Sequence, residues 1–228
     1  MEITPIATFH SPFKEKFGIP RQSGLVGELE GSIVFLPEFR NPDYIRGIEE
    51  FDFIWIIWEF SANRHDAASP TVRPPRLGGN ERMGVYATRS PYRHNRLGLS
   101  AVRLDRVEID AARGPVLHVR GADLMDGTPI YDIKPYVAYA DSHPEARGGF
   151  VDSNEWKTLD VTIPDEVARQ FSQQQLDALR HTLALDPRPH YHADPNKVYG
   201  MMFMGKDIHF KVDGSQLIVI TDSEKSNL

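Results

Sequence analysis

Apolar and polar residues alternate in several short segments of the first 163 residues, and Gly and Pro separate these segments. A period of two is typical of a half-buried β-strand. Residues 100–109 show this period, with a slip between Leu104 and Val107 that indicates a β-bulge. The predicted strands are residues 3–9, 25–36, 53–60, 84–88, 99–109 and 115–121.

The run FIWIIWEF at residues 53–60 is too continuous to alternate. It indicates a central strand that is covered on both faces, or one whose second face lies in an interface. Only residues 42–51 have the spacing of a short helix in this part of the chain. Many short strands without strand–helix alternation predict a mainly β fold, built as a closed or nearly closed β-barrel.

The pattern becomes helical after Ile163, where residues 165–185 form an amphipathic stretch. Ser172 followed by Gln175 is a capping box and allows two helical pieces. Strands are predicted at 198–204, 208–212 and 216–221, with Asp213-Gly214 as the turn between the last two. We therefore expect a β-barrel main domain at residues 1–160 and a small α+β C-terminal domain at residues 161–228.

Composition excludes several kinds of chemistry. The chain has 228 residues and no Cys, so it has no disulfide, no thiolate zinc site, no iron–sulfur cluster and no thiol nucleophile. Its start lacks the apolar core of a signal peptide, and its longest apolar run, residues 53–58, is too short to span a membrane. These features predict a cytoplasmic protein that does not bind membranes.

Charge is segregated along the chain. The formal net charge is −6, yet residues 64–106 hold nine Arg, no Lys and three acidic residues. Arginine offers a planar fork for phosphates and stacks on bases, so this segment favours a phosphate-bearing partner. The alternative is an arginine-rich face paired with the acidic remainder of the chain, including across a subunit interface.

Three polar segments are candidate sites. Residues 82–100 break a strand at Ser90-Pro91 and carry four Arg and an Asn, although a plain surface loop explains the break equally well. Residues 120–136 contain the turn Asp126-Gly127, followed by Asp132 and Lys134 on one face of an extended segment, a spacing suited to an acid–base pair. The alternative there is a turn and an edge strand with its charges in water. The third segment is the loop 17–24.

Metal and nucleotide signatures are weak or absent. His190, His192 and Asp194 alternate as metal ligands can, but no further strong ligand accompanies them, so we expect no metal site. The sequence has neither a P-loop nor a dinucleotide-binding glycine motif.

Four motifs in order resemble the TsaA-like (TrmO-type) family of tRNA methyltransferases. They are KEKFGIPRQ, PTVRPPRLGGNERMGVYATRSPYRHNRLGLS, DLMDGTPIYDIKPY and LDPRPHY, and the similarity is strong over about residues 3–142. The resemblance implies an S-adenosylmethionine-dependent enzyme that is built on a β-barrel. It further implies a homodimer whose cofactor sites lie near the subunit interface. It also implies methylation of N6 of threonylcarbamoyladenosine at tRNA position 37, and hence binding of the anticodon stem-loop.

The resemblance assigns residues to roles. Around the cofactor it implies Pro20, Arg21, Gln22, Ser61, Ala62, Arg89, Leu99, Asp126, Gly127 and Thr128. Facing the tRNA or supporting the site are Tyr92, Arg93, Asn95, Arg96, Tyr131 and Tyr136. Because loss of the N6 proton would localise the lone pair of that nitrogen, Asp126 or Asp132 is a candidate base and Lys134 a candidate for stabilising the developing anion.

Two other functions are compatible with the same residues. A non-catalytic RNA-binding β-barrel predicts tRNA affinity without affinity for S-adenosylmethionine. A methyltransferase for another substrate, such as a small molecule, predicts cofactor binding without salt-sensitive RNA binding.

Overall fold

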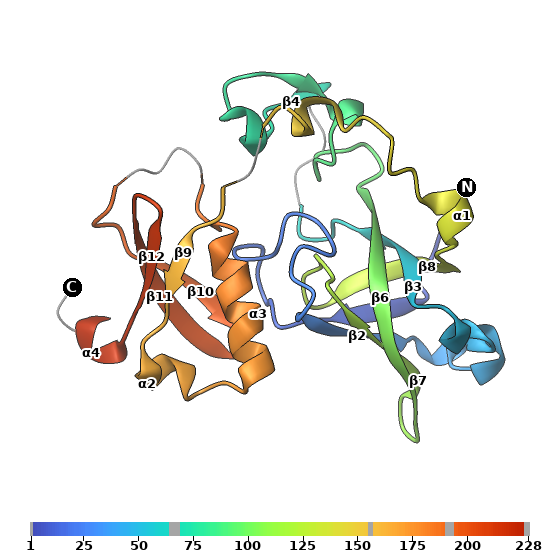
Figure 1. Cartoon of the computed structure of the whole chain (residues 1–228). Helices are drawn as coiled ribbons and strands as arrows, with labels where there is room; N and C mark the ends of the chain where they lie inside the picture. The colour runs from blue at the N-terminus through green and yellow to red at the C-terminus, as the bar shows by residue number, and fades with distance from the viewer. Residues whose placement is uncertain (1, 64–68, 155–156, 190–193, 226–228) are drawn as a thin grey trace.

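A closed, six-stranded antiparallel barrel forms the larger part of the molecule (Figure 1). The computed structural model describes residues 2–63, 69–154, 157–189 and 194–225. The barrel strands are β1 (Ala7–His10), β2 (Glu30–Phe35), β3 (Phe53–Glu59), β6 (Leu97–Asp110), β7 (Gly114–Arg120) and β8 (Thr128–Pro135). They close in the order β1-β2-β7-β6-β3-β8, which confirms the predicted fold class.

Alternation along the strands fills the barrel interior with apolar side chains. Phe9, Ile33, Ile54, Ile56 and Trp58 are buried in this core. The continuous run in β3 follows the same rule, because Ile54, Ile56 and Trp58 point inward while the residues between them are only partly covered. β3 is central, between β6 and β8, and its outer face is half-buried within one chain.

Two irregularities interrupt the barrel ladder. The β6–β7 register shifts between Leu104 and Arg106, which confirms the predicted bulge. The β3–β8 register shifts between Ile57 and Trp58, opposite Tyr131. A bulge redirects the side chains beside it, so the second shift changes which residues of β8 face outward.

Two sequence predictions are wrong in this half of the chain. Residues 42–51 do not form one helix but two 3₁₀ turns, η2 (Pro42–Ile45) and η3 (Ile48–Glu50), because Gly47 between them has a φ of +85°. Residues 84–88 do not form a strand. Only β5 (Met83–Gly84) pairs with the two-residue β4 (Thr71–Val72), and η5 (Val85–Ala87) turns inward to bury Val85. The other short helices are η1 (Pro37–Phe39), η4 (Pro75–Leu77), α1 (Ala138–Asp141) and η6 (Gly149–Val151).

The C-terminal part is a four-stranded sheet covered by a helix. The order is β10 (Tyr199–Phe203), β11 (Lys206–Asp213), β12 (Gln216–Ile220) and β9 (Asp160–Thr162), with β9 parallel to β12. The two predicted helical pieces are α2 (Asp165–Ala168) and α3 (Gln173–Ala184), and α4 (Asp222–Lys225) follows the sheet. Ser172 forms the expected capping box with Gln175. β9 was not predicted from the sequence.

The connection between β1 and β2 joins the two parts. Phe13, Val26 and Leu29 belong to the apolar core of the C-terminal part, although they lie next to barrel strands in the sequence. The Phe13 ring meets Phe203 edge-on, with centroids 5.7 Å apart. Figure 1 shows this blue connection between the barrel and the C-terminal sheet. The loop that carries residues 20–22 is therefore held from both sides.

Among the residues that the structure describes, no helix has the length and apolarity needed to cross a membrane.

Candidate functional site

Three long connections leave the barrel at the same end. They are residues 11–29 between β1 and β2, residues 60–96 between β3 and β6, and residues 121–127 between β7 and β8. The register places their ends together, since His10 pairs with Ser32, Glu59 with Leu97 and Phe9 with Thr128. We call these three connections the loop rim.

Most of the predicted cofactor residues lie on the loop rim, and two of its loops meet directly. The Arg89 guanidinium donates a hydrogen bond to Oε1 of Gln22, which brings the second motif against the first. Nearby, the Gly24 N–H donates to the Gly121 carbonyl oxygen at 2.8 Å and attaches the first connection to the third. Pro20 is buried, whereas Arg89 is exposed.

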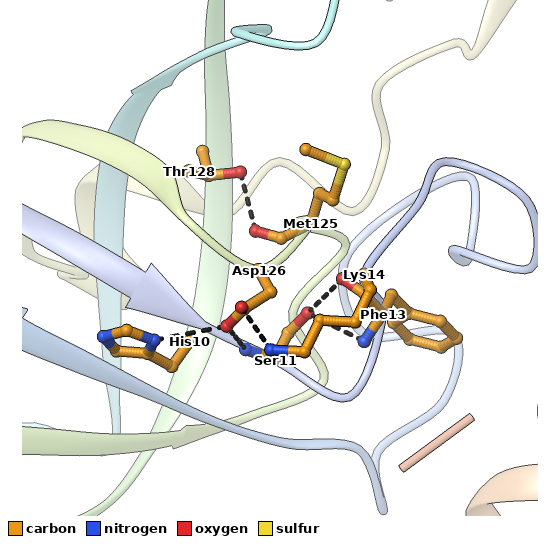
Figure 2. Close-up of polar contacts among 7 residues, drawn as sticks. All are labelled: His10, Ser11, Phe13, Lys14, Met125, Asp126 and Thr128. Carbon is orange, nitrogen blue, oxygen red and sulfur yellow. Dashed lines mark hydrogen bonds and ion pairs between the residues drawn. The ribbon is translucent and has the colours of Figure 1, made fainter. Parts of the chain in front are cut away.

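Asp126 anchors the third connection to the end of β1 (Figure 2). Its Oδ1 accepts the Ser11 N–H and lies 3.2 Å from His10 Nδ1, and its Oδ2 accepts Lys14 Nζ at 2.5 Å. Desolvation raises the pKa of this carboxyl, but the hydrogen bonds from Lys14 and Ser11 outweigh it and hold the pKa below its usual value. A carboxylate stabilised in this way is a weaker base, so its contacts favour an anchoring role.

The turn at Gly127 completes this anchor. Gly127 has a φ of +77°, a conformation that side-chain-bearing residues rarely adopt, and its N–H donates to the Phe9 carbonyl oxygen at 2.8 Å. The Thr128 hydroxyl is buried and donates to the Met125 carbonyl oxygen at 2.7 Å, as Figure 2 shows. The predicted Asp126–Thr128 segment is thus a rigid corner of the loop rim.

Asp123, which was not predicted from the sequence, is the rim carboxylate that reaches into the barrel core. Its Oδ1 accepts the Ser100 hydroxyl at 2.7 Å, and Ser100 Oγ accepts the Trp58 indole N–H at 3.0 Å. Desolvation raises its pKa, while hydrogen bonds from Ser100 and the Ser23 backbone and the charge of Arg89 oppose the rise. Its partners lie far away in the sequence, so no local spacing could have identified it.

Arg21 connects the loop rim to the C-terminal motif LDPRPHY. Its guanidinium donates to the Asp186 carbonyl oxygen at 3.1 Å. Desolvation, only partly offset by Asp186, lowers the pKa of Arg21 to about 10, so the group stays cationic at neutral pH. The Asp186 side chain forms a two-pronged pair with Arg188, at 2.8 and 2.9 Å. The structure thus brings together motifs from both ends of the chain.

A second polar cluster surrounds the end of β3. Arg96 donates to the Asn63 carbonyl oxygen at 3.3 Å and lies 3.7 Å from Glu59, whose other oxygen accepts the Tyr131 hydroxyl at 2.7 Å. Lys16 donates to the Asn63 side-chain oxygen. Desolvation and the bond to Glu59 raise the pKa of Tyr131. Arg96 and Tyr131, two residues predicted to bind tRNA, therefore both contact the Glu59 carboxylate. This carboxylate lies beside the predicted cofactor positions Ser61 and Ala62.

Arg93 is folded back onto its own loop. Its guanidinium donates to the carbonyl oxygens of Thr88 at 2.9 Å and Ser90 at 3.4 Å. Tyr92 and Asn95 are exposed on the same loop. Arg93 therefore shapes the loop that presents Tyr92 and Asn95.

Four predicted site residues lie away from the rim within one chain. Asp132 and Lys134 form an exposed ion pair of 3.1 Å on the outer face of β8, opposite Ile57 and Trp55. Lys134 is six residues beyond Thr128, which is roughly 20 Å along the strand. Leu99, 58% exposed, lies opposite Ile57 on the same outer face.

Tyr136 lies still further from the rim. Its ring packs beside Trp55, with centroids 5.6 Å apart, and beside Phe53, at 6.1 Å. The outer face of β3, β6 and β8 thus carries a second group of candidate residues.

No cluster of three or more metal-ligating side chains is found in the part of the chain that the structure describes. His190 and His192 lie outside the described residues.

The closed barrel with a polar loop rim and an α+β C-terminal part defines the class of protein: a two-part β-barrel whose site is built on loops. The tRNA-methyltransferase O N-terminal domain model matches residues 8–142, and the TrmO C-terminal domain model matches residues 157–224. The chain belongs to the tRNA-methyltransferase O family.

Individual relatives match nearly the whole chain. It is 38% identical over 215 residues to the "tRNA (adenine(37)-N6)-methyltransferase" of Escherichia coli, covering 91% of each protein. It is 37% identical to a "putative S-adenosylmethionine-dependent methyltransferase RcsF" of Pseudomonas aeruginosa, covering 96% of each. The crystal structure of TrmO from Pseudomonas aeruginosa superposes with a TM-score of 0.76 at 30% identity, covering 96% of this chain and 97% of that one.

Proposed function

We propose that this protein transfers a methyl group from S-adenosylmethionine to N6 of adenosine 37 in tRNA, and that the substrate base is threonylcarbamoyladenosine. The observation that carries the proposal is the meeting of three motifs on one rim, where Gln22 touches Arg89 and Asp126 fixes the adjoining corner. A relative named for methylation of N6 of adenine 37 in tRNA matches 91% of the chain.

The donor and acceptor groups of the rim fit the cofactor. S-adenosylmethionine has a carboxylate and ribose hydroxyls for donors such as Arg21 and Gln22, and a cationic sulfonium and amino group that suit carboxylates nearby. The ionised Asp126 supplies such a carboxylate. The cofactor brings an electrophilic methyl group, so this chain needs only to orient the acceptor nitrogen in line and exclude water.

The proton on N6 requires an acceptor. Asp126 is held in its charged form by Lys14 and Ser11, which makes it a poor base and a good anchor. Asp132 pairs with Lys134, as expected of a base beside a cation that stabilises a developing anion, but both lie on the outer face of β8. For these two residues to act on a substrate at the rim, a second chain must bring its β8 to that rim.

We accordingly propose a homodimer that pairs through the outer face of β3, β6 and β8. The half-buried Trp55 and Ile57 and the exposed Leu99 give this face an apolar centre, which a second chain would cover. Sedimentation velocity tests this directly: a species of twice the chain mass supports it, and a monomer at micromolar concentration contradicts it.

The arginine-rich connection between β3 and β6 would bind phosphates of the anticodon stem-loop. The exposed ring of Tyr92 would stack on an unpaired base of the tRNA. Since tRNA is the proposed substrate, we also propose a cytoplasmic location.

The deciding experiment is mass spectrometry of tRNA nucleosides from cells that lack the protein, together with methyl transfer to that tRNA by the purified protein. Loss of the methylated base and its restoration in vitro support the proposal. Affinity for tRNA without affinity for S-adenosylmethionine would identify an RNA-binding barrel instead. Cofactor binding with no transfer to tRNA would indicate another substrate.

A further inference from the structure

Asp123 lies where the loop rim meets the barrel core. On its barrel side, the carboxylate accepts the Ser100 hydroxyl at 2.7 Å, and Ser100 is held by the Trp58 indole at 3.0 Å. Ser100 is 2% exposed, so this chain of hydrogen bonds runs through the interior. One end of the network is therefore fixed by the barrel itself.

The other side of the carboxylate faces the proposed cofactor loops. Two residues before Asp123, the Gly121 carbonyl oxygen accepts the Gly24 N–H at 2.8 Å, which attaches the loop of residues 20–22 to the segment that carries the carboxylate. The Ser23 backbone and the positive charge of Arg89 both lower the pKa of this carboxyl. Arg89 in turn donates to Gln22. Asp123 thus lies between β6 of the barrel and the two rim connections that meet at Gln22 and Arg89.

We propose that Asp123 is a positioning residue of the cofactor site, whose ionised carboxylate holds Arg89 and residues 20–22 in the arrangement that receives the cofactor. The identity of the cofactor rests on the proposed function. Asp123 acts through Arg89 and the segment around Ser23 rather than by contact with the cofactor, since its Oδ1 accepts the buried Ser100 hydroxyl.

The charge of Asp123 makes this role dependent on pH. Desolvation raises the pKa of the carboxyl, so it gains a proton at a higher pH than an exposed aspartate does. Protonation removes the negative charge that faces Arg89, while Ser100, Trp58 and Ser23 offer no charge to replace it. Affinity for the cofactor should therefore fall on acidification.

Titration calorimetry with S-adenosylmethionine tests the proposal on the full-length protein. Asp123→Asn keeps the size of the side chain but removes its charge, and we expect the dissociation constant to rise about ten-fold or more. Affinity for tRNA without cofactor should change less than about two-fold, which a general folding defect would not allow. Asp43→Asn, at an exposed aspartate of the opposite end of the barrel, should alter neither value. Equal cofactor affinity in wild type and Asp123→Asn overturns the inference.

A second variant keeps the test decisive if Asp123→Asn does not fold. The Ser100 hydrogen bond lowers the pKa of Asp123, so Ser100→Ala should move the midpoint of the loss of cofactor affinity to higher pH. An unmoved midpoint contradicts the inference. If the wild type fails to bind S-adenosylmethionine at all, the proposed function falls, and this inference with it.

Discussion

Trp58 lies flat over Gly98 at the inner wall of the barrel, just below the loop rim. A Cβ on Gly98 would come within 2.4 Å of the indole, and the indole N–H is committed to Ser100. The absence of a side chain at one position of β6 therefore lets a large residue of β3 pack and extend the network toward Asp123. The alternating pattern predicted both strands, but not that a glycine was needed for this contact.

We predict that Gly98→Ala lowers the free energy of unfolding by about 1–3 kcal/mol, because overpacking forces the indole to move. Chemical denaturation measures this. Gly84→Ala is the matched control, since no atom lies within 4 Å of its added Cβ, and it should stay within about 0.5 kcal/mol of wild type. A Gly98→Ala protein as stable as the control would show that the indole relaxes freely.

Arginine residues of the rim differ in what they are free to bind. Arg93 is engaged by the carbonyl oxygens of Thr88 and Ser90, so Arg93→Ala disturbs the loop as well as any phosphate contact. Arg73 is exposed and has no hydrogen bond or ion pair to another described residue. It is therefore the cleaner probe of the tRNA interface.

For Arg73→Ala we expect weaker tRNA binding and a salt dependence shallower by about one unit of slope, as one lost phosphate contact predicts. Arg46→Ala, an exposed arginine at the opposite end of the barrel, should leave the slope unchanged. Fluorescence anisotropy over a range of salt concentrations gives both slopes. Equal slopes for the two variants would count against a phosphate contact at Arg73.

At the scale of elements, three features that a short stretch of sequence specifies were predicted correctly. The bulge in β6, the capping box of α3 and the turn after β11 each depend on residues within a few positions. β9 has only three residues and pairs with β12, more than fifty residues away, so no local sequence pattern predicts this strand. The same limit applies to the site, where Gln22 and Arg89 meet across 67 residues of chain.

The contribution of a single helix cap to stability can be measured at the N-terminus of α3. Ser172→Ala removes the acceptor for the Gln175 N–H and should cost about 1 kcal/mol. Ser142→Ala replaces an exposed serine that follows α1 and should be close to neutral. Thermal unfolding of the pair separates a capping effect from a general effect of losing a hydroxyl. Equal stability of the two variants would contradict the cap.

The β6–β7 hairpin should respond to acid. Asp110 accepts hydrogen bonds from the side chain and backbone N–H of Arg113 and from the Ala112 N–H, and these lower its pKa to about 2. A lowered pKa means that this contribution to stability is present above about pH 4, the unfolded value, and is lost as the pH falls toward 2. We expect the amide chemical shifts of Ala112 and Arg113 to titrate with a midpoint near 2; a midpoint near 4 would contradict these bonds.

In the whole molecule, the proposed cofactor loop is part of the C-terminal core rather than an appendage of the barrel. Phe13 is 1% exposed and contacts Phe203, and its carbonyl oxygen also accepts the Asp126 N–H at 2.8 Å. Arg21 reaches the Asp186 carbonyl oxygen from the same loop. The C-terminal part therefore acts on the rim by packing against the segment that carries residues 20–22.

Phe13→Ala tests this coupling. Truncating a buried Phe should lower the free energy of unfolding by about 3–5 kcal/mol, and because the lost contacts join both parts, it should also weaken cofactor binding at the rim. Denaturation and calorimetry on the same samples measure the two effects. Tyr139→Ala, at a ring that is 93% exposed, is the control and should change neither. A strongly destabilised Phe13→Ala protein with wild-type cofactor affinity would mean that the loop keeps its shape without the C-terminal core. Packing between the two parts would then contribute to stability but not to cofactor binding.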